Sequence, residues 1–214
     1  MGRRALPKIP TDCDISQHFL ELDHLTPPFV PLEAFDNERP LEIEVGSGKG
    51  LFLADASLAQ PAHSFLGIEI ARKYARFIAS RLVRKNVNNA KIISGDANVF
   101  FADFLADNQV TAVHIYFPDP WWKKRHHKRR IMNQEFLTRV TRVLKPGGSL
   151  HFWTDVEEYF RMSVALIETQ IPLEGPLPVP ESSPHHDLDY RTHFERKKRQ
   201  TGYDIFRSEF LKPN

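Results

Sequence analysis

Short runs rich in apolar and β-branched residues alternate along the chain with longer segments in which apolar residues recur at helical spacing. The first pattern predicts strands, and the second predicts amphipathic helices. From residue 41 onward the two kinds of segment follow each other regularly. This alternation favours an α/β fold with a mostly parallel, doubly wound sheet, because each helix connects one strand to the next.

The boundaries of the predicted elements follow from this alternation. Strands are predicted at 41–45, 64–68, 91–94, 111–117 and 149–154, and helices at 49–58, 72–86, 97–105, 133–144 and 156–168. Phe136, Val140 and Val143 share one helix face, and the sequence Lys145-Pro146-Gly147-Gly148 ends that helix because Pro and Gly interrupt helical hydrogen bonding. Residues 203–211 alternate aromatic or aliphatic residues with polar ones, which predicts an antiparallel closing strand.

Two segments lack periodicity. Residues 1–40 contain many prolines, which predicts an irregular N-terminal arm followed by a single domain at 41–214. A second Pro-rich segment, between Pro172 and Pro184, predicts a surface loop. We find no internal repeats.

Composition narrows the class of protein. The chain has 214 residues, of which 41% are hydrophobic and 26% charged, values of an ordinary globular protein. Cys13 is the only cysteine, which excludes an intramolecular disulfide and a cysteine-rich zinc site and suits the cytoplasm. No apolar run is long enough for a membrane helix, so we expect a soluble cytoplasmic protein. Because there is only one cysteine to act as a ligand, we also expect no bound metal.

A glycine-rich turn follows the first regular strand, in the sequence Glu44-Val45-Gly46-Ser47-Gly48-Lys49-Gly50. Glycines at such a turn let a ligand approach the backbone closely, because no Cβ blocks it. A dinucleotide fingerprint would need glycine where Leu51 stands, and a P-loop would need Ser or Thr after Lys49. The spacing therefore disfavours NAD and nucleoside triphosphates.

Two acidic residues stand at the ends of the next two strands. Glu69 can accept hydrogen bonds from both ribose hydroxyls of a nucleoside, and Asp96 can accept one from the exocyclic amine of adenine. Together they predict an adenosine-containing cofactor that needs no phosphate contact. The alternative is that the glycines form an ordinary turn and the acids cap helices.

The segment after the fourth predicted strand combines several kinds of chemistry. It places Asp119 between two prolines, then Trp121 and Trp122, then a basic run that extends to Arg130. The segment thus combines a held carboxylate, aromatic surfaces on which a base can stack and cations that can bind phosphate. The alternatives are that the tryptophans belong to the core and that the basic run is a solvated face. The adjacent histidines lack cysteine partners, which favours an RNA surface over a metal site.

This segment resembles the P-D-P-W-x-K-x-R-H-x-K-R-R signature of the bacterial single-subunit tRNA (guanine-N7-)-methyltransferases. The resemblance covers roughly residues 41 to 210. It extends to the E-x-G-x-G-x-G turn and to the sequences Gly67-Ile68-Glu69, Gly95-Asp96-Ala97, Thr154-Asp155 and Arg191-Thr192-His193-Phe194-Glu195-Arg196. His193 departs from the pattern, because the family often has Lys there.

The resemblance implies a Rossmann-like class I methyltransferase that transfers a methyl group from S-adenosylmethionine to N7 of guanine in tRNA, expected at nucleotide 46 of the variable loop. It implies activity without an obligatory protein partner, as a monomer or homodimer, and Asp119 as the catalytic acid. The predicted cofactor-binding residues are Glu44, Gly46, Gly48, Gly50, Glu69, Asp96, Ala97 and Asp119. The predicted substrate-binding residues are Lys123, Arg125, Lys128, Arg129, Arg130, Asp155, Thr192, Phe194 and Glu195.

Two other functions fit parts of the pattern. A small-molecule methyltransferase can share the fold, since a fold does not determine a substrate, although the basic run speaks against it. A noncatalytic RNA-binding module is the other alternative, and the intact acids speak against that. A second basic cluster, formed by Arg191, Arg196, Lys197, Lys198 and Arg199, is predicted to extend the phosphate-binding surface.

Overall fold

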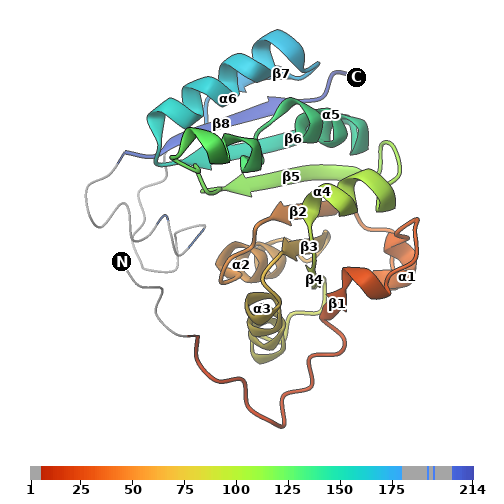
Figure 1. Ribbon diagram of the computed structural model, residues 1–214. Coiled ribbons are helices and arrows are strands. Elements are labelled where there is room, and N and C mark those ends of the chain that lie inside the picture. Colours follow the sequence, from red (N-terminus) through yellow and green to blue (C-terminus); the bar gives the residue numbers. More distant parts are fainter. Residues whose placement is uncertain (1–5, 180–191, 193–194, 196–203) are drawn as a thin grey trace.

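The computed structural model describes residues 6–179, 192, 195 and 204–214. The strands of its single sheet are β1 (Phe19–Glu21), β2 (Leu41–Val45), β3 (Ser64–Glu69), β4 (Ala90–Ser94), β5 (Val110–Tyr116), β6 (Leu144–Thr154), β7 (Glu174–Leu177) and β8 (Phe206–Leu211). They are arranged in the order β1-β4-β3-β2-β5-β6-β8-β7 (Figure 1). β1 to β6 pair in parallel, whereas β8 is antiparallel to β6 and β7. The predicted fold class is confirmed.

Helices cover both faces of the sheet. They are α1 (Pro31–Phe35), α2 (Leu51–Ala59), α3 (Arg72–Arg84), α4 (Ala97–Val99), α5 (Gln134–Val143) and α6 (Glu157–Gln170). Shorter turns are the 3-10 helices η1 (Leu22–His24) and η3 (Lys124–Arg129) and the π-helical turn η2 (Phe100–Phe104). Phe65 of β3 packs with α2 and α3, whereas its neighbour Leu66 packs in the core that contains α5 and α6. Because successive strand residues point to opposite faces, the two cores lie on opposite sides of the sheet.

The N-terminal segment differs from the irregular arm that the sequence predicts. Phe19, Leu20 and Glu21 pair in parallel with residues of β4, and the side chains of Phe29 and Phe35 are buried in the core. A three-residue strand is too short for its alternation to show in the sequence. The division of the chain at residue 40 remains a prediction.

The C-terminal segment also differs from the prediction. β7 lies within the Pro-rich segment predicted to be a loop and pairs with β8. β6 begins at Leu144 rather than at residue 149, because Leu144 already pairs with Val110 before the register shifts. Gly147 stands within this irregular stretch with φ of 73°. Residue 203, where the closing strand is predicted to begin, lies outside the described residues.

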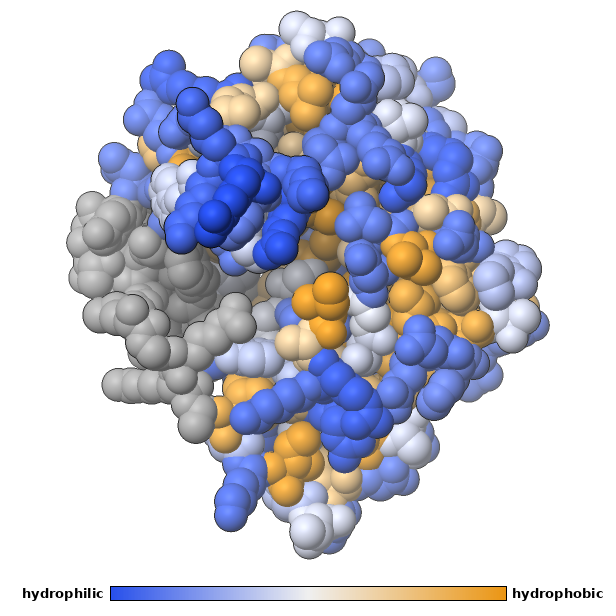
Figure 2. All heavy atoms as spheres, viewed as in Figure 1, coloured by the Kyte–Doolittle hydropathy of each residue, from blue (hydrophilic) through white to orange (hydrophobic). Residues whose placement is uncertain are grey.

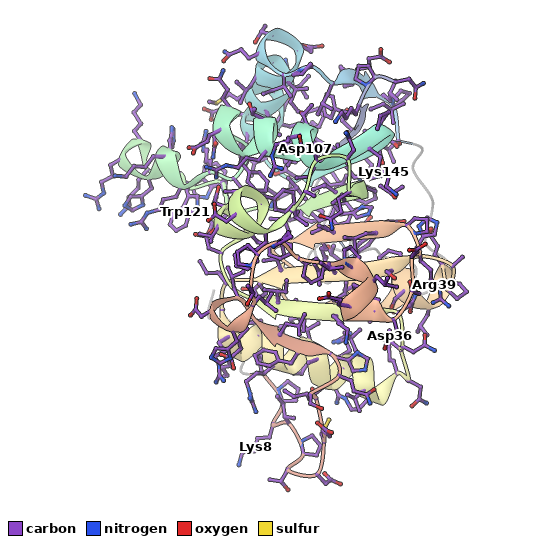
Figure 3. All side chains as sticks on the ribbon, turned by 90° about the vertical axis from the view of Figure 1, so that its right-hand side faces the viewer. Lys8, Asp36, Arg39, Asp107, Trp121 and Lys145 are labelled. Atoms are coloured by element: carbon purple, nitrogen blue, oxygen red, sulfur yellow. The ribbon has the colours of Figure 1, made fainter. Side chains whose placement is uncertain are left out.

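The strand order places a ligand site at one edge of the sheet. After β2, the strands β3 and β4 are added on one side of it, and β5 and β6 are then added on its other side. The direction in which strands are added therefore reverses at the position between β2 and β5. Ligands of doubly wound sheets bind at the carboxyl ends of the strands at such a switch point. The glycine turn after β2 and the segment after β5 therefore meet at this edge. Figure 3 shows Trp121 on this side of the molecule, with Arg39 and Lys145 on the opposite side.

Candidate active site

The glycine turn leaves open space at the switch point. Gly46, Gly48 and Gly50 have φ values of 76°, 56° and 66°, a region that favours glycine. A Cβ built on Gly46 meets no atom within 4 Å, and one on Gly48 meets only the Gly46 carbonyl oxygen, at 3.9 Å. A Cβ on Gly50 would instead lie 2.7 Å from the Ile78 side chain. Gly46 and Gly48 thus border space that a ligand can enter, whereas Gly50 permits close packing between α2 and α3.

Glu69 forms hydrogen bonds both with this glycine turn and with the residue that precedes α3. Its Oε2 atom accepts a hydrogen bond from the Gly48 backbone N–H at 2.9 Å, and its Oε1 atom accepts one from the Ala71 N–H at 3.0 Å. A carboxylate has about four acceptor sites, so both oxygens can accept further hydrogen bonds from a ligand. Glu69 is therefore placed both to fix the turn and to bind hydroxyl groups beside it.

Asp96 lies at the next strand end, on a cleft of about 440 Å³. Its Oδ1 atom accepts hydrogen bonds from the backbone N–H and the side-chain amide of Asn98, at 2.8 and 3.1 Å, so it caps α4, where Ala97 is buried. The capping alternative thus describes part of its role. Ile70 and Val99 also line the cleft, with exposed fractions of 74% and 43%. Sequence reasoning missed these two apolar residues, although each lies within three positions of an acid at a strand end.

The segment after β5 holds Asp119 in an unusual backbone conformation. Phe117 and Trp121 have φ values of 51° and 46°, which non-glycine residues seldom adopt. Pro118 and Pro120 lie between them on either side of Asp119, and the Asp119 side chain is exposed. Sparsely populated backbone conformations cost about 1–3 kcal/mol each and gather at functional sites. The structure therefore presents a carboxylate at the sheet edge next to the open glycine turn.

The basic run continues from this segment as the exposed 3-10 helix η3. The exposed cations are Lys123, Lys124, Arg125, Lys128 and Arg129. The Arg129 guanidinium lies 5.0 Å from the centre of the Trp121 ring, and Trp122 has an exposed fraction of 69%. Figure 3 shows Trp121 next to a short helical segment that projects from the rest of the molecule. An exposed basic surface with an available aromatic ring can bind phosphates and stack on a base.

Comparisons with known proteins agree with this arrangement. The model of a family described as putative methyltransferase matches residues 38–208. A tRNA (guanine-N(7)-)-methyltransferase of Rhodopirellula baltica is 45% identical over 97% of this chain and 79% of that protein. The chain belongs to the tRNA (guanine-N7-)-methyltransferase family. The family predicted from the sequence is thereby confirmed.

More distant matches support the family and the fold of this methyltransferase. The protein of the same name from Pasteurella multocida is 32% identical over 92% of this chain and 78% of its own length. The crystal structure of a mutant 16S rRNA (adenine(1408)-N(1))-methyltransferase of Catenulisporales acidiphilia, with cosubstrate SAM, has a TM-score of 0.58 at 16% identity. That similarity covers 87% of this chain and 92% of that one. At this identity it establishes the shared fold alone.

Arg130 differs from the other cations of the methyltransferase's basic run because it is only 8% exposed. Its Nε atom donates a hydrogen bond to the Pro120 carbonyl oxygen at 2.7 Å, and its guanidinium lies 4.9 Å from the centre of the Tyr159 ring. The Tyr159 hydroxyl in turn accepts a hydrogen bond from the Met132 N–H at 3.2 Å. Arg130 thus fastens the Asp119 segment to α6, whereas Arg129 beside it faces solvent.

Of the other predicted site residues of the methyltransferase, the structure describes some but not all. Asp155 follows β6 at the same edge of the sheet as Asp119. The Glu195 backbone N–H donates a hydrogen bond to the Thr192 hydroxyl at 2.9 Å, and Glu195 is 3% exposed. Phe194, His193 and the second basic cluster at 191 and 196–199 lie outside the described residues. Within the described part of the chain, no cluster of His, Cys, Asp and Glu could bind a metal, and no helix is long and apolar enough to cross a membrane.

Glu44 lies beneath the glycine turn of the methyltransferase. It is 4% exposed, and within the described residues its Oε2 atom is buried without a hydrogen-bond partner. Burial raises the pKa of Glu44 to about 7, and the nearby Glu69 carboxylate adds to this rise. A buried acceptor below open ligand space fits a cofactor that brings a hydrogen-bond donor or a positive charge.

Replacing Glu44 with Gln is expected to remove a pH dependence of stability. The folded-state pKa of about 7 exceeds the ordinary value of 4.5, so the stabilisation from protonated Glu44 is complete below pH 4.5 and is lost as the pH rises through 7. A shift of this size corresponds to about 3 kcal/mol in the free energy of unfolding. Urea denaturation of both proteins at pH 5 and pH 8 measures the difference. Parallel pH profiles for the two proteins would contradict the shifted pKa.

Proposed function

We propose that this chain transfers a methyl group from S-adenosylmethionine to N7 of guanine at nucleotide 46 in the variable loop of tRNA. The observation that carries the proposal is the exposed Asp119 carboxylate, held between two left-handed residues beside the open glycine turn. The cytoplasm is the compartment that fits this substrate. The chain is expected to act as a monomer or homodimer without another protein.

The residues at the glycine turn and at the neighbouring cleft fit S-adenosylmethionine, which supplies an activated methyl group when bound. The space beside Gly46 and Gly48 admits a ligand against the backbone. The Glu69 carboxylate can accept the ribose hydroxyls, and the exposed side chains of Ile70 and Val99 offer apolar contact to adenine. The buried Glu44 oxygen suits the positive charge of the methionine amino group. None of these contacts requires a phosphate, which agrees with a nucleoside cofactor.

The chemistry at guanine explains why a carboxylate suits this site. N7 already has a lone pair, so it can form the bond to the methyl carbon as the carbon–sulfur bond breaks, without first losing a proton. The positive charge of the sulfonium then passes to the purine. The Asp119 carboxylate would accept hydrogen bonds from the N–H edge of guanine and stabilise that charge. Alignment of the reacting atoms supplies much of the acceleration, since ideal positioning contributes roughly 7–11 kcal/mol.

The surface around Asp119 is suited to the RNA part of the substrate. The cations of η3 together with Lys123 are exposed next to the Asp119 segment, and no acidic residue interrupts the run from Trp121 to Arg130. Phosphate contacts orient a nucleic acid, while contacts to the base edge select the nucleotide. We assign orientation to η3 and selection of guanine to Asp119.

The test is methyl transfer from radiolabelled S-adenosylmethionine to unmodified tRNA by the purified chain. Nuclease digestion and mass spectrometry then locate the modified nucleotide, and a tRNA with adenine at position 46 is the matched control. Formation of 7-methylguanosine at nucleotide 46, absent from the control, is expected. Label in small acceptors but not in tRNA would overturn the assignment of substrate, and label at another guanine would overturn the assignment of position.

A further inference from the structure

The start of α3 carries cations where a helix normally disfavours them. Arg72 and Lys73 lie in the first turn of α3 and Arg76 in the second, and the first turn contains no acidic residue. The helix dipole favours acidic side chains near the N-terminus, so these residues oppose a local preference. From Ile70 to Gly95 the sequence contains no Asp or Glu at all. Residues that break a local rule in this way are expected at functional surfaces.

Lys73 and Arg76 are available to a partner, whereas Arg72 is not. Arg72 donates two hydrogen bonds to the Glu21 carboxylate, at 2.9 and 2.7 Å. Lys73 and Arg76 are exposed, and neither forms an ion pair in the part of the chain that the structure describes. The Arg76 guanidinium lies 5.8 Å from the centre of the Phe19 ring. Its charge helps Arg72 to lower the pKa of Glu21, but only Arg72 is within ion-pair distance of that carboxylate.

These two cations lie beside the cleft. Glu69 joins Gly48 of the glycine turn to Ala71, the residue immediately before α3. Ile70 and Arg72 line the cleft itself. Figure 2 shows two strongly hydrophilic groups of side chains, one over η3 and one over α3, with hydrophobic side chains between them. Exposed cations therefore stand on α3 beside the cleft and on η3, on two sides of the sheet edge where the glycine turn and the Asp119 segment meet.

We infer that Lys73 and Arg76 form a second phosphate-binding surface, which contacts the tRNA backbone on the side of the cleft opposite η3. The inference rests on the proposed function. An RNA strand that presents one base to the site has phosphates on both sides of that base, and η3 serves only one side. Cations on the other side fix the direction in which the strand crosses the cleft, because phosphate contacts set register and orientation.

The experiment compares two double variants of the full-length protein. Lys73→Gln with Arg76→Gln removes the proposed contacts, and Arg39→Gln with Lys145→Gln removes equal charge from the opposite side of the molecule (Figure 3). Binding of unmodified tRNA is measured by fluorescence anisotropy over a series of salt concentrations. Each lost phosphate contact reduces the magnitude of the slope of log affinity against log salt by about 0.7–0.9. The loss of two contacts is therefore expected to weaken binding roughly tenfold near physiological salt. Binding of S-adenosylhomocysteine by calorimetry is expected to stay unchanged in both variants.

The outcomes separate the inference from the proposed function. A reduced slope for the Lys73 and Arg76 variant, with a wild-type slope for the control variant, supports the second surface. If both variants keep the wild-type slope, while the wild type binds and methylates tRNA, the second surface is overturned and the proposed function stays intact. Equal reductions in both variants also overturn it, because they reflect total charge alone. Failure of the wild type to bind or methylate tRNA overturns the proposed function and the inference with it.

Discussion

Replacing Asp119 with Asn is expected to slow single-turnover methyl transfer to tRNA roughly 10²–10³-fold, the usual loss when a preorganised group that stabilises developing charge is removed. Asn has nearly the same shape, so the segment between Phe117 and Trp121 should keep its conformation. The Asn side chain lacks the negative charge, however, and presents an amide N–H toward the N–H edge of guanine. Rapid-quench measurements with saturating tRNA and cofactor report the chemical step directly.

The matched control for Asp119 is Asp36→Asn. Asp36 is also exposed and directly follows α1, and Figure 3 shows it on the side of the molecule away from Trp121. Its φ of 55° is one that Asn tolerates well. The control is expected to keep the wild-type rate. An Asp119→Asn enzyme that also kept the wild-type rate would show that positioning alone drives the transfer and that the carboxylate has no role in it.

The central strands and helices of this fold can be predicted because each carries a complete local signal. β2 spans the five residues that the sequence predicts, and α3 begins at the predicted residue. β1 and β7 cannot be predicted in the same way, because they have three and four residues and are stabilised by pairing with strands distant in sequence. Such edge strands are determined by tertiary contacts rather than by periodicity.

Sequence reasoning can find charged residues but cannot tell which way they face. Arg129 and Arg130 are adjacent and chemically identical, and both are predicted to bind substrate. In the structure Arg129 is exposed, while Arg130 is buried against Pro120 and Tyr159. The difference arises because η3 ends at Arg129, and the Arg130 side chain then reaches the Pro120 carbonyl and the Tyr159 ring of α6. Arg130 therefore supports the site from within, a role that a count of charges does not reveal.

The two glutamates of β2 give a second example. Glu42 and Glu44 point to the same face of the sheet, because they are two residues apart on one strand. Glu42 is buried between His63 and His114, with distances of 2.6 and 2.7 Å from its oxygens to the ring nitrogens. Glu44 has a buried oxygen without a partner among the described residues. The glycine motif identifies Glu44 only through its position next to Gly46, and the structure supplies the reason that the two acids differ.

Replacing Glu69 with Ala is expected to weaken binding of S-adenosylhomocysteine roughly 10³-fold. The change removes the acceptor for the Gly48 N–H and, by the proposed function, the acceptors for both ribose hydroxyls. Hydrogen bonds to charged groups contribute about 1.5–3 kcal/mol each, so losing two of them to the ligand accounts for about 4 kcal/mol. Isothermal titration calorimetry measures the affinity without requiring tRNA or catalysis.

Two further variants separate the possible causes of that loss. Glu135→Ala removes an exposed carboxylate that pairs with Arg139 on α5, and it should leave cofactor affinity unchanged. Glu69→Gln keeps one carbonyl oxygen that can accept from Gly48, so it should preserve the turn but bind the ribose with one acceptor fewer. If Glu69→Gln binds as weakly as Glu69→Ala, the negative charge is what the ribose requires. If instead Glu69→Gln binds as the wild type does, Glu69 acts by fixing the glycine turn, and the ribose contact is overturned.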